Sequence, residues 1–290
     1  MNPELIADYA CDVGEGPLWN PVDHQLYWVD WTTGSLFRFD PSTGKHERCH
    51  RGRSIGGFTI QQDGTILLFM DGPSVAIWKN GEMRYVVNHV PDSENMHFND
   101  VIADPEGRVF CGTVSKIRDD IKNGAGKLYR LNTDGTLIPL VKNVGISNGL
   151  GFTPNRKGLY YTDSYAHTIY LFDYERETGE IRNQRVWIET PNDGSLPDGL
   201  TVDSNGDVWS ARWDGSALYQ YTADGNEKQR IDFPVLKVSS VTFGGPNYSD
   251  IYVTTAGGQN KTYEGTNAGA LFRIRNGGQG VAEFASRIYL

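Results

Sequence analysis

A polar turn followed by an aromatic-rich strand recurs six times along this chain of 290 residues. The equivalent turn positions in the six units are His24, Gly64, Gly107, Gly158, Gly206 and Asp250. The intervals between these positions run from 40 to 51 residues. A period in the forties with several short strands per unit is typical of a β-propeller blade. The sequence therefore predicts an all-β fold, a six-bladed β-propeller with four strands in each blade.

Composition supports one large β domain. Glycine accounts for 34 of the 290 residues and falls mainly in the turns, and no long segment carries the 3.6-residue apolar period of a helix. No low-complexity linker divides the chain, so a single domain over residues 1–290 is predicted. The N-terminal stretch 4–11 is expected to close the ring as the outer strand of the last blade. The C-terminal stretch 282–290 is the competing candidate for that place.

Net charge excludes some partners. A formal charge of −9 argues against a nucleic acid or an anionic membrane surface as partner, because both attract basic proteins. The first residues lack the basic and apolar regions of a signal peptide, and no apolar run approaches the length of a membrane span. Cys11, Cys49 and Cys111 form no CxxC pair, so we expect reduced, structural cysteines in a cytoplasmic protein.

Oxygen-bearing side chains recur at one place in the repeat, about eight to ten residues before the turn. Four of the six units carry one there: Glu15, Asn99, Asn148 and Asp198. The same position holds Gly57 in the second unit and approximately Ser240 in the sixth. In a propeller these positions would converge at one end of the central channel. Because hard divalent cations take oxygen ligands, the pattern predicts a metal site there.

Two of these residues have a simpler interpretation when each is taken alone. Asn148 and Asp198 precede glycines, and Asn–Gly and Asp–Gly pairs are ordinary turn formers. The register that all four positions share favours the metal site over four unrelated turns.

Two long inter-strand loops, 114–127 and 256–268, are predicted to border the site, since long insertions on one face of a repeat fold often build the binding surface. Arg212 is expected at the mouth, at the end of a second strand. Lys116, Arg118 and Lys261 lie in the two loops. Cations gathered at one mouth of an acidic protein predict a preference for an anionic substrate.

An ordered set of motifs resembles the gluconolactonase/regucalcin (senescence-marker-protein) family over essentially the whole chain. The set comprises GEGP (14–17), FND (98–100), ISNGL (146–150), YYTDS (160–164), FDY with TGEI (172–181), PDGL (197–200) and FGGPNYSDIYVTTA (243–256). The resemblance implies a six-bladed propeller with one divalent metal at the end of the central channel. It also implies hydrolysis of sugar-acid lactones.

The resemblance implies Glu15, Asn148 and Asp198 as metal ligands. Asn99 would be a fourth ligand or the residue beside the metal that holds substrate. The family's regucalcin-like members carry an arginine two positions before this asparagine, where it contacts sugar hydroxyls, and this chain has His97 there. His97 would donate a hydrogen bond to a substrate hydroxyl, bind an anionic group of the substrate, or have a purely structural role. The identity of the substrate therefore stays open.

The predicted function is a metal-dependent hydrolase that opens the lactone ring of a sugar acid. The metal would polarise the carbonyl, and Asp198 would act as the general base. His97, Asn99 and Arg212 would bind the substrate. The metal is Ca²⁺, Zn²⁺, Mn²⁺ or Mg²⁺, and the protein a monomer or weak homo-oligomer.

Three alternatives remain. The first is a broader metal-dependent esterase or phosphotriesterase. The second is a non-enzymatic calcium-binding propeller. A protein-interaction propeller is the third, and it would carry exposed apolar hot spots instead of convergent oxygen ligands.

Overall fold

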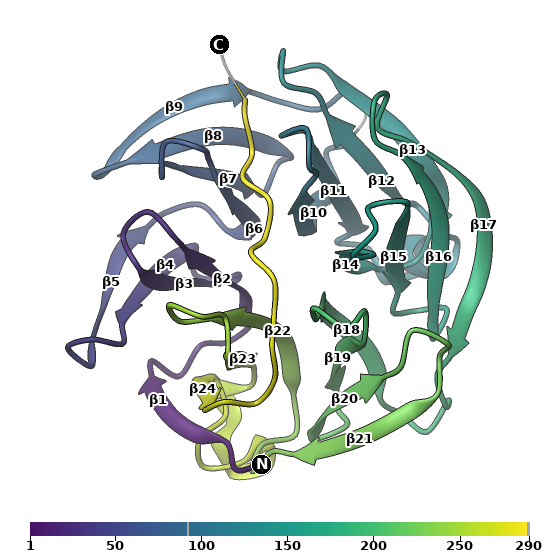
Figure 1. The fold of residues 1–290 in the computed structure, drawn as a ribbon. Coiled ribbons are helices and arrows are strands. Elements are labelled where there is room, and N and C mark those ends of the chain that lie inside the picture. The colour runs from purple at the N-terminus through teal and green to yellow at the C-terminus, as the bar shows by residue number, and fades with distance from the viewer. Residues whose placement is uncertain (92, 289–290) are drawn as a thin grey trace. The chain divides into compact units, whose positions relative to one another are not determined.

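Each of the six repeats folds into a four-stranded antiparallel sheet, and the sheets are the blades of a six-bladed β-propeller (Figure 1). The computed structural model describes residues 1–91 and 93–288. In five sheets the spatial order of the strands follows the chain, and the sixth takes its outermost strand from the N-terminus. The predicted fold class is confirmed. By its contacts the chain divides into two compact units, Met1–Gly52 with Thr190–Ala282, and Arg53–Glu189 with Glu283–Leu290.

The first unit contains three sheets. Its first sheet is β2 (Gly14–Asn20), β3 (Gln25–Asp30), β4 (Ser35–Asp40) and β5 (Lys45–Arg51). Its second is β18 (Leu196–Val202), β19 (Val208–Trp213), β20 (Ala217–Tyr221) and β21 (Glu227–Asp232). Its third is β22 (Val238–Gly244), β23 (Asp250–Thr255), β24 (Ala270–Ile274) and β1 (Glu4–Asp8).

The second unit contains the other three sheets. The first is β6 (Ile55–Ile60), β7 (Ile66–Met70), β8 (Ser74–Lys79) and β9 (Glu82–Val87). The next is β10 (Met96–Ala103), β11 (Val109–Ser115), β12 (Gly126–Leu131) and β13 (Leu137–Val144). The last is β14 (Ser147–Phe152), β15 (Gly158–Asp163), β16 (Thr168–Glu175) and β17 (Glu180–Glu189).

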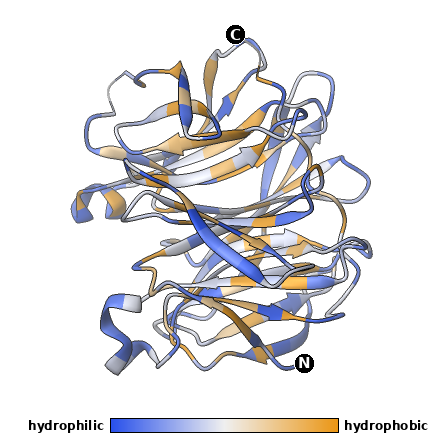
Figure 2. Ribbon diagram, turned by 90° about the vertical axis from the view of Figure 1, so that its left-hand side faces the viewer, coloured by the Kyte–Doolittle hydropathy of each residue, from blue (hydrophilic) through white to orange (hydrophobic). Residues whose placement is uncertain are grey.

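Burial changes from the inner to the outer strands of a sheet. All residues of β6 and β7 are buried, whereas β5 and β9 are mostly exposed or half-buried and carry several charged side chains. Orange apolar and blue polar segments alternate along the ribbon in Figure 2. Apolar side chains form cores between successive sheets of each unit. Charged outer strands protect the exposed sheet edges from pairing with another chain.

The N-terminal strand β1 completes the last sheet, as the sequence predicted. It pairs antiparallel with β24, with Glu4 opposite Arg273 and Asp8 opposite Ala270. The Glu4 carboxylate accepts hydrogen bonds from Arg273 (3.1 Å) and Arg275 (3.0 Å).

The C-terminal segment lies elsewhere, so it is not the closing strand. Ser286 forms a parallel bridge with Gln61, and the Ile288 amide donates to the Gln61 side-chain oxygen at 2.9 Å. Arg287 donates its backbone N–H to Gly107 at 2.8 Å. Residues 283–288 thus pack on the second unit, and residues 289–290 lie outside the described residues.

Over residues 1–91 and 93–288, helix occurs only in the two long loops. The first carries α1 (Arg118–Lys122), and the second carries η1 (Gly258–Asn260) and α2 (Lys261–Glu264). None of the helices described is long and apolar enough to cross a membrane.

The three cysteines are free thiols. Burial raises the pKa of Cys49 to about 11, and it raises the pKa of Cys11 and Cys111 as well. Thiols held protonated are poor nucleophiles, which fits the structural role predicted for them.

A buried ionic network joins two sheets of the second unit. Asp104 is fully buried, and its carboxylate accepts from the Arg108 Nε at 2.5 Å and from the Tyr174 hydroxyl at 2.9 Å. Arg108 also donates to the Glu177 carbonyl at 3.1 Å. The network therefore links the turn after β10 to the turn after β16.

Asp104→Ala is expected to lower the free energy of unfolding by about 3–5 kcal/mol, because it leaves the Arg108 guanidinium buried without its carboxylate. Chemical denaturation measures the loss. Asp134→Ala, in an exposed turn of the same sheet, is the control and is expected to cost about 1 kcal/mol or less. Equal losses in the two variants would mean that the buried pair contributes nothing special.

Candidate functional site

Every innermost strand contains a register shift at the same point along its length. In β2 the shift falls between Glu15 and Leu18, and in β14 it falls between Asn148 and Leu150. The other shifts lie at Ile55/Gly57, Phe98/Val101, Pro197/Leu200 and Val238/Ser240. All four oxygen-bearing residues found by sequence register lie in or directly beside these irregularities. A β-bulge re-aims a side chain, so the sequence register corresponds to a real structural position.

In the second unit, the structure brings two of these residues close together. The Asn99 Nδ2 donates to the carbonyl of Ser147 at 2.9 Å, directly beside Asn148. The Asn148 Nδ2 donates to the Ser164 hydroxyl at 3.1 Å. Both asparagines use their amide N–H groups on the protein itself. These bonds orient each amide, and the atom of each amide that suits a cation is its carbonyl oxygen.

In the first unit, the two carboxylates flank the inner strand β22. The Ser239 hydroxyl donates to the carbonyl of Gly14 at 2.5 Å, beside Glu15. On the other side, a Cβ added at Gly199, next to Asp198, would lie 2.2 Å from the Ser240 hydroxyl. Glycine is needed at 199 because the strands approach so closely there. Asp198 is buried (4% exposed), and a buried carboxylate must be hydrogen-bonded, paired or coordinated.

His97 lies in β10, two residues before Asn99, and is only 6% exposed. Burial lowers the pKa of His97 to about 4; the nearby Asp71 carboxylate acts to raise this pKa and Lys116 to lower it. The imidazole is therefore neutral at pH 7, with one donor and one acceptor nitrogen. This favours a hydrogen bond to a hydroxyl over recognition of an anion.

The lowered pKa of His97 also makes stability depend on pH. As the pH falls through about 6.5 the unfolded chain binds a proton at this residue, whereas the folded chain does not until about pH 4. The contribution of His97 to the free energy of unfolding is therefore fully present above about pH 6.5. It is lost as the pH falls toward 4, and the loss is about 3 kcal/mol at most. We expect the unfolding free energy of the wild type to fall more steeply over this range than that of His97→Gln. Parallel curves would contradict the burial effect.

Arg212 lies in β19, and its backbone pairs with Pro197, next to Asp198. Its side chain extends toward β20. The guanidinium donates to the Tyr221 hydroxyl at 2.6 Å and lies 4.9 Å from the Tyr219 ring centre, both on β20. Arg212 is 2% exposed, and its Nη1 is buried without a hydrogen-bond partner among the described residues. The role of Arg212 in substrate binding stays a prediction, and this buried donor is compatible with it.

Two of the loop cations expected to attract an anionic substrate are already paired. The Lys116 Nζ lies 2.6 Å from an Asp71 carboxylate oxygen, and the Lys261 Nζ lies 2.6 Å from one of Asp8. Each pair cancels most of the field of its lysine. Two of the four cations behind the expectation of an anionic substrate are therefore largely neutralised.

The donor set decides which metals suit the site. Across residues 1–91 and 93–288, no group of three or more His, Cys, Asp or Glu side chains is placed to hold a metal ion. The predicted ligand set differs from such a group because only two of its members, Glu15 and Asp198, are carboxylates. The other two, Asn99 and Asn148, are amides. All four offer oxygen, and two have their amides oriented by hydrogen bonds. Such donors fit a hard divalent cation.

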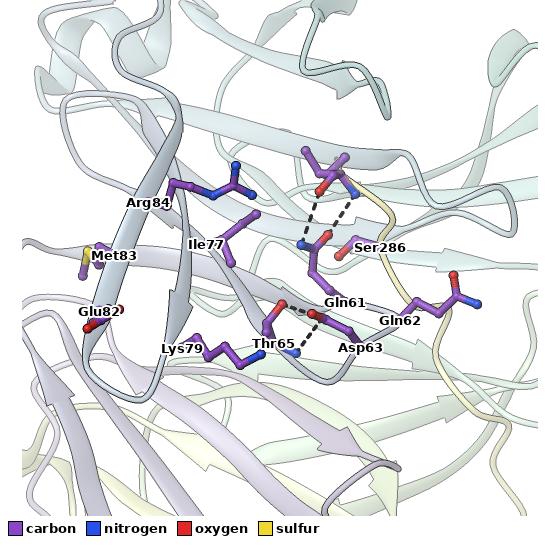
Figure 3. A pocket seen from close by; sticks show the side chains of 11 residues that line it. Gln61, Gln62, Asp63, Thr65, Ile77, Lys79, Glu82, Met83, Arg84 and Ser286 are labelled. Atoms are coloured by element: carbon purple, nitrogen blue, oxygen red, sulfur yellow. Dashed lines mark hydrogen bonds between the residues drawn. The ribbon is translucent and has the colours of Figure 1, made fainter. Parts of the chain in front are cut away.

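A cavity of about 740 Å³ in the second unit contains none of the predicted residues (Figure 3). The cavity lies beside the last residues of β6, whereas Asn99 lies beside the first. At that first end, a Cβ added to Gly56 would come within 1.9 Å of the Phe98 carbonyl oxygen. Gln61, Asp63, Lys79, Arg84 and Ser286 are among its lining residues. The cavity is therefore remote from the candidate site.

Three contributors to the site were not predicted from the sequence. Ser147 and Ser164 orient the two asparagines, and Asp71 neutralises Lys116. Ser147 and Ser164 do lie in the ISNGL and YYTDS motifs, which is a usable signal. Asp71 and Lys116 are far apart in the sequence, and no local pattern connects them.

Comparison with known proteins places the chain in a family. Residues 13–257 match the family model described as SMP-30/Gluconolactonase/LRE-like region. The chain is 45% identical to a protein of Haloferax volcanii described as pentonolactonase XacC, and the match covers 100% of both chains.

Solved structures agree. A luciferin-regenerating enzyme superposes with a TM-score of 0.87 at 27% identity, covering 99% of this chain and 100% of that one. A calcium-binding protein, regucalcin, from Agrobacterium tumefaciens superposes with a TM-score of 0.89 over 100% of this chain and 98% of that one; at 21% identity it shows the fold alone. With a family model matching most of its length, the chain belongs to the SMP-30/gluconolactonase/LRE-like family.

Proposed function

We propose that this protein is a divalent-metal-dependent lactonase that opens the lactone ring of a sugar acid. The observation that carries the proposal is the set of four oxygen donors at one structural position of the inner strands, two of them with hydrogen-bonded amides. The 45% identical relative described as a pentonolactonase supports the reaction class. A five- or six-carbon aldonolactone is the substrate class that follows.

We infer that Glu15, Asn148 and Asp198 are the ligands of a single cation and that Asn99 lies beside it. This assignment rests on their shared register, on their oxygen chemistry and on the membership of the family. Ca²⁺, Zn²⁺, Mn²⁺ and Mg²⁺ all accept such ligands, and the choice among them follows geometry and availability. When bound, the cation would polarise the lactone carbonyl and lower the pKa of a water molecule.

The chain's own residues perform the proton transfers and hold the substrate. Asp198 takes a proton from the attacking water as the water oxygen bonds to the carbonyl carbon. The ring C–O bond then breaks, and the protonated Asp198 gives its proton to the ring oxygen, which leaves as a hydroxyl. The carboxylic acid formed loses its own proton to solvent and becomes the aldonate. Asn99 and the neutral imidazole of His97 hydrogen-bond sugar hydroxyls, which orients the carbonyl. Arg212 would donate from its Nη1, the buried nitrogen without a partner among the described residues.

We also propose that the chain works in the cytoplasm, as one domain and as a monomer or weak homo-oligomer. The three free cysteines support a reducing compartment. The uniform propeller repeat supports a single domain.

A proton-release assay with an indicator dye tests the proposal. The substrates are a pentono-1,4-lactone, glucono-1,5-lactone and paraoxon, each with the four metals. We expect turnover of the lactones and little hydrolysis of paraoxon. Faster hydrolysis of paraoxon would favour the phosphotriesterase alternative. Metal binding without turnover of any lactone would favour a non-enzymatic calcium-binding protein.

A further inference from the structure

Lys116 and Asp71 form an ion pair in the second unit, near Asn99 and His97. The Lys116 Nζ lies 2.6 Å from the Asp71 Oδ1, and the same oxygen accepts the Gly72 N–H at 2.7 Å. The side chains are 40% and 34% exposed. Asp71 is therefore held in place by a backbone donor as well as by the lysine.

Backbone pairing places both partners near the candidate site. Lys116 follows β11, and its amide donates to the carbonyl of Asn95, just before β10 begins. Asp71 follows β7, which pairs with β6, and β6 lies against Phe98 and Asn99. The electrostatic influence of Asp71 and Lys116 on His97 agrees with this placement. Arg53 also donates to Asp71, but to its backbone carbonyl oxygen, at 3.5 Å.

The proposed reaction changes the charge of the ligand. A neutral aldonolactone and water give an aldonate and a proton, with no redox change. An unpaired lysine beside the site would attract the anionic product more than the neutral substrate, and would slow its release.

We propose that Asp71 is a specificity-determining residue that neutralises Lys116, so that the site favours the neutral lactone and releases the aldonate. The inference rests on the proposed lactonase function. It reverses the preference for anionic substrates that the loop cations predict from sequence. One unit charge several ångströms from a bound anion changes its affinity by about threefold to tenfold at the dielectric constant of water, which applies to side chains as exposed as these.

Calorimetric titration of the metal-loaded protein with gluconate tests the proposal, and it requires no turnover. Asp71→Asn is expected to lower the Kd of gluconate about threefold to tenfold, because Lys116 is then unpaired. Lys116→Met leaves Asp71 alone and is expected to raise the Kd. The double variant is expected to return near the wild-type value. Raising the ionic strength should shrink all of these differences.

Asp173→Asn is the matched control. It frees Arg185 from an ion pair of 2.7 Å on the outer strands β16 and β17 of the same unit, and it is expected to leave the Kd of gluconate unchanged. A Kd unchanged by Asp71→Asn, or lowered equally by Asp173→Asn, would overturn the proposal.

Lactone hydrolysis by the wild type distinguishes a failure of the proposed role of Asp71 from a failure of the proposed lactonase function. If lactones are hydrolysed but Asp71→Asn does not change gluconate binding, only the role of Asp71 fails. A wild type that neither hydrolyses lactones nor binds gluconate contradicts the proposed function, and the role of Asp71 fails with it.

Discussion

Asp198→Asn is expected to lower kcat for lactone hydrolysis by about 10²-fold or more while the fold is kept. Asparagine preserves the shape of the side chain and one oxygen ligand, but it does not accept a proton from water. Asp198 lies in the bulge of β18 and is 4% exposed, so few other groups can replace it. Initial rates at saturating lactone and saturating metal measure the effect.

Asp224→Asn is the control for this substitution, since it changes an exposed aspartate in the turn after β20 of the same sheet. Its kcat is expected to match the wild type. A near-normal kcat in Asp198→Asn, with the metal still bound, would remove Asp198 from the role of general base.

Glu15→Gln and Asn148→Ala are each expected to weaken metal binding by at least about tenfold, the lower limit typical of losing even an outer-shell partner. The gain in Tm on adding metal should shrink in both variants, because a ligand that binds only the folded state stabilises it by mass action. Calorimetric metal titration and thermal unfolding with and without metal give the two quantities.

Glu177→Gln, an exposed residue in the turn after β16, serves as the control and is expected to bind metal like the wild type. Unchanged metal affinity in both Glu15→Gln and Asn148→Ala would show that the shared register does not mark a metal site.

The repeat structure could be predicted because each sheet obeys the same local rules. A turn residue such as Gly107 or Gly206 marks the end of every inner strand, and the following strand carries the aromatics that fill the core. The same periodicity located Glu15, Asn99, Asn148 and Asp198, since a fixed offset in sequence becomes a fixed place in each sheet. The closing strand at Glu4–Asp8 followed from the need to cover an edge.

What the sequence did not predict depends on tertiary contacts between side chains. The sequence predicts Arg212 at the mouth, but its contacts with the tyrosines of β20 depend on packing and leave no local signal. The loop lysines were treated as free charges, although Asp71 and Asp8 lie 45 and 253 residues away from them in sequence. Such distant pairs leave no periodic signal.

The rate of lactone hydrolysis before and after removal of metal tests the central claim most directly. The wild type is treated with a chelator, desalted, and assayed on a pentono-1,4-lactone alone and with each divalent cation restored. We expect the rate to fall to that of the uncatalysed reaction after chelation and to recover with at least one cation. Full activity in the metal-free protein, or no activity under any condition, would contradict the account.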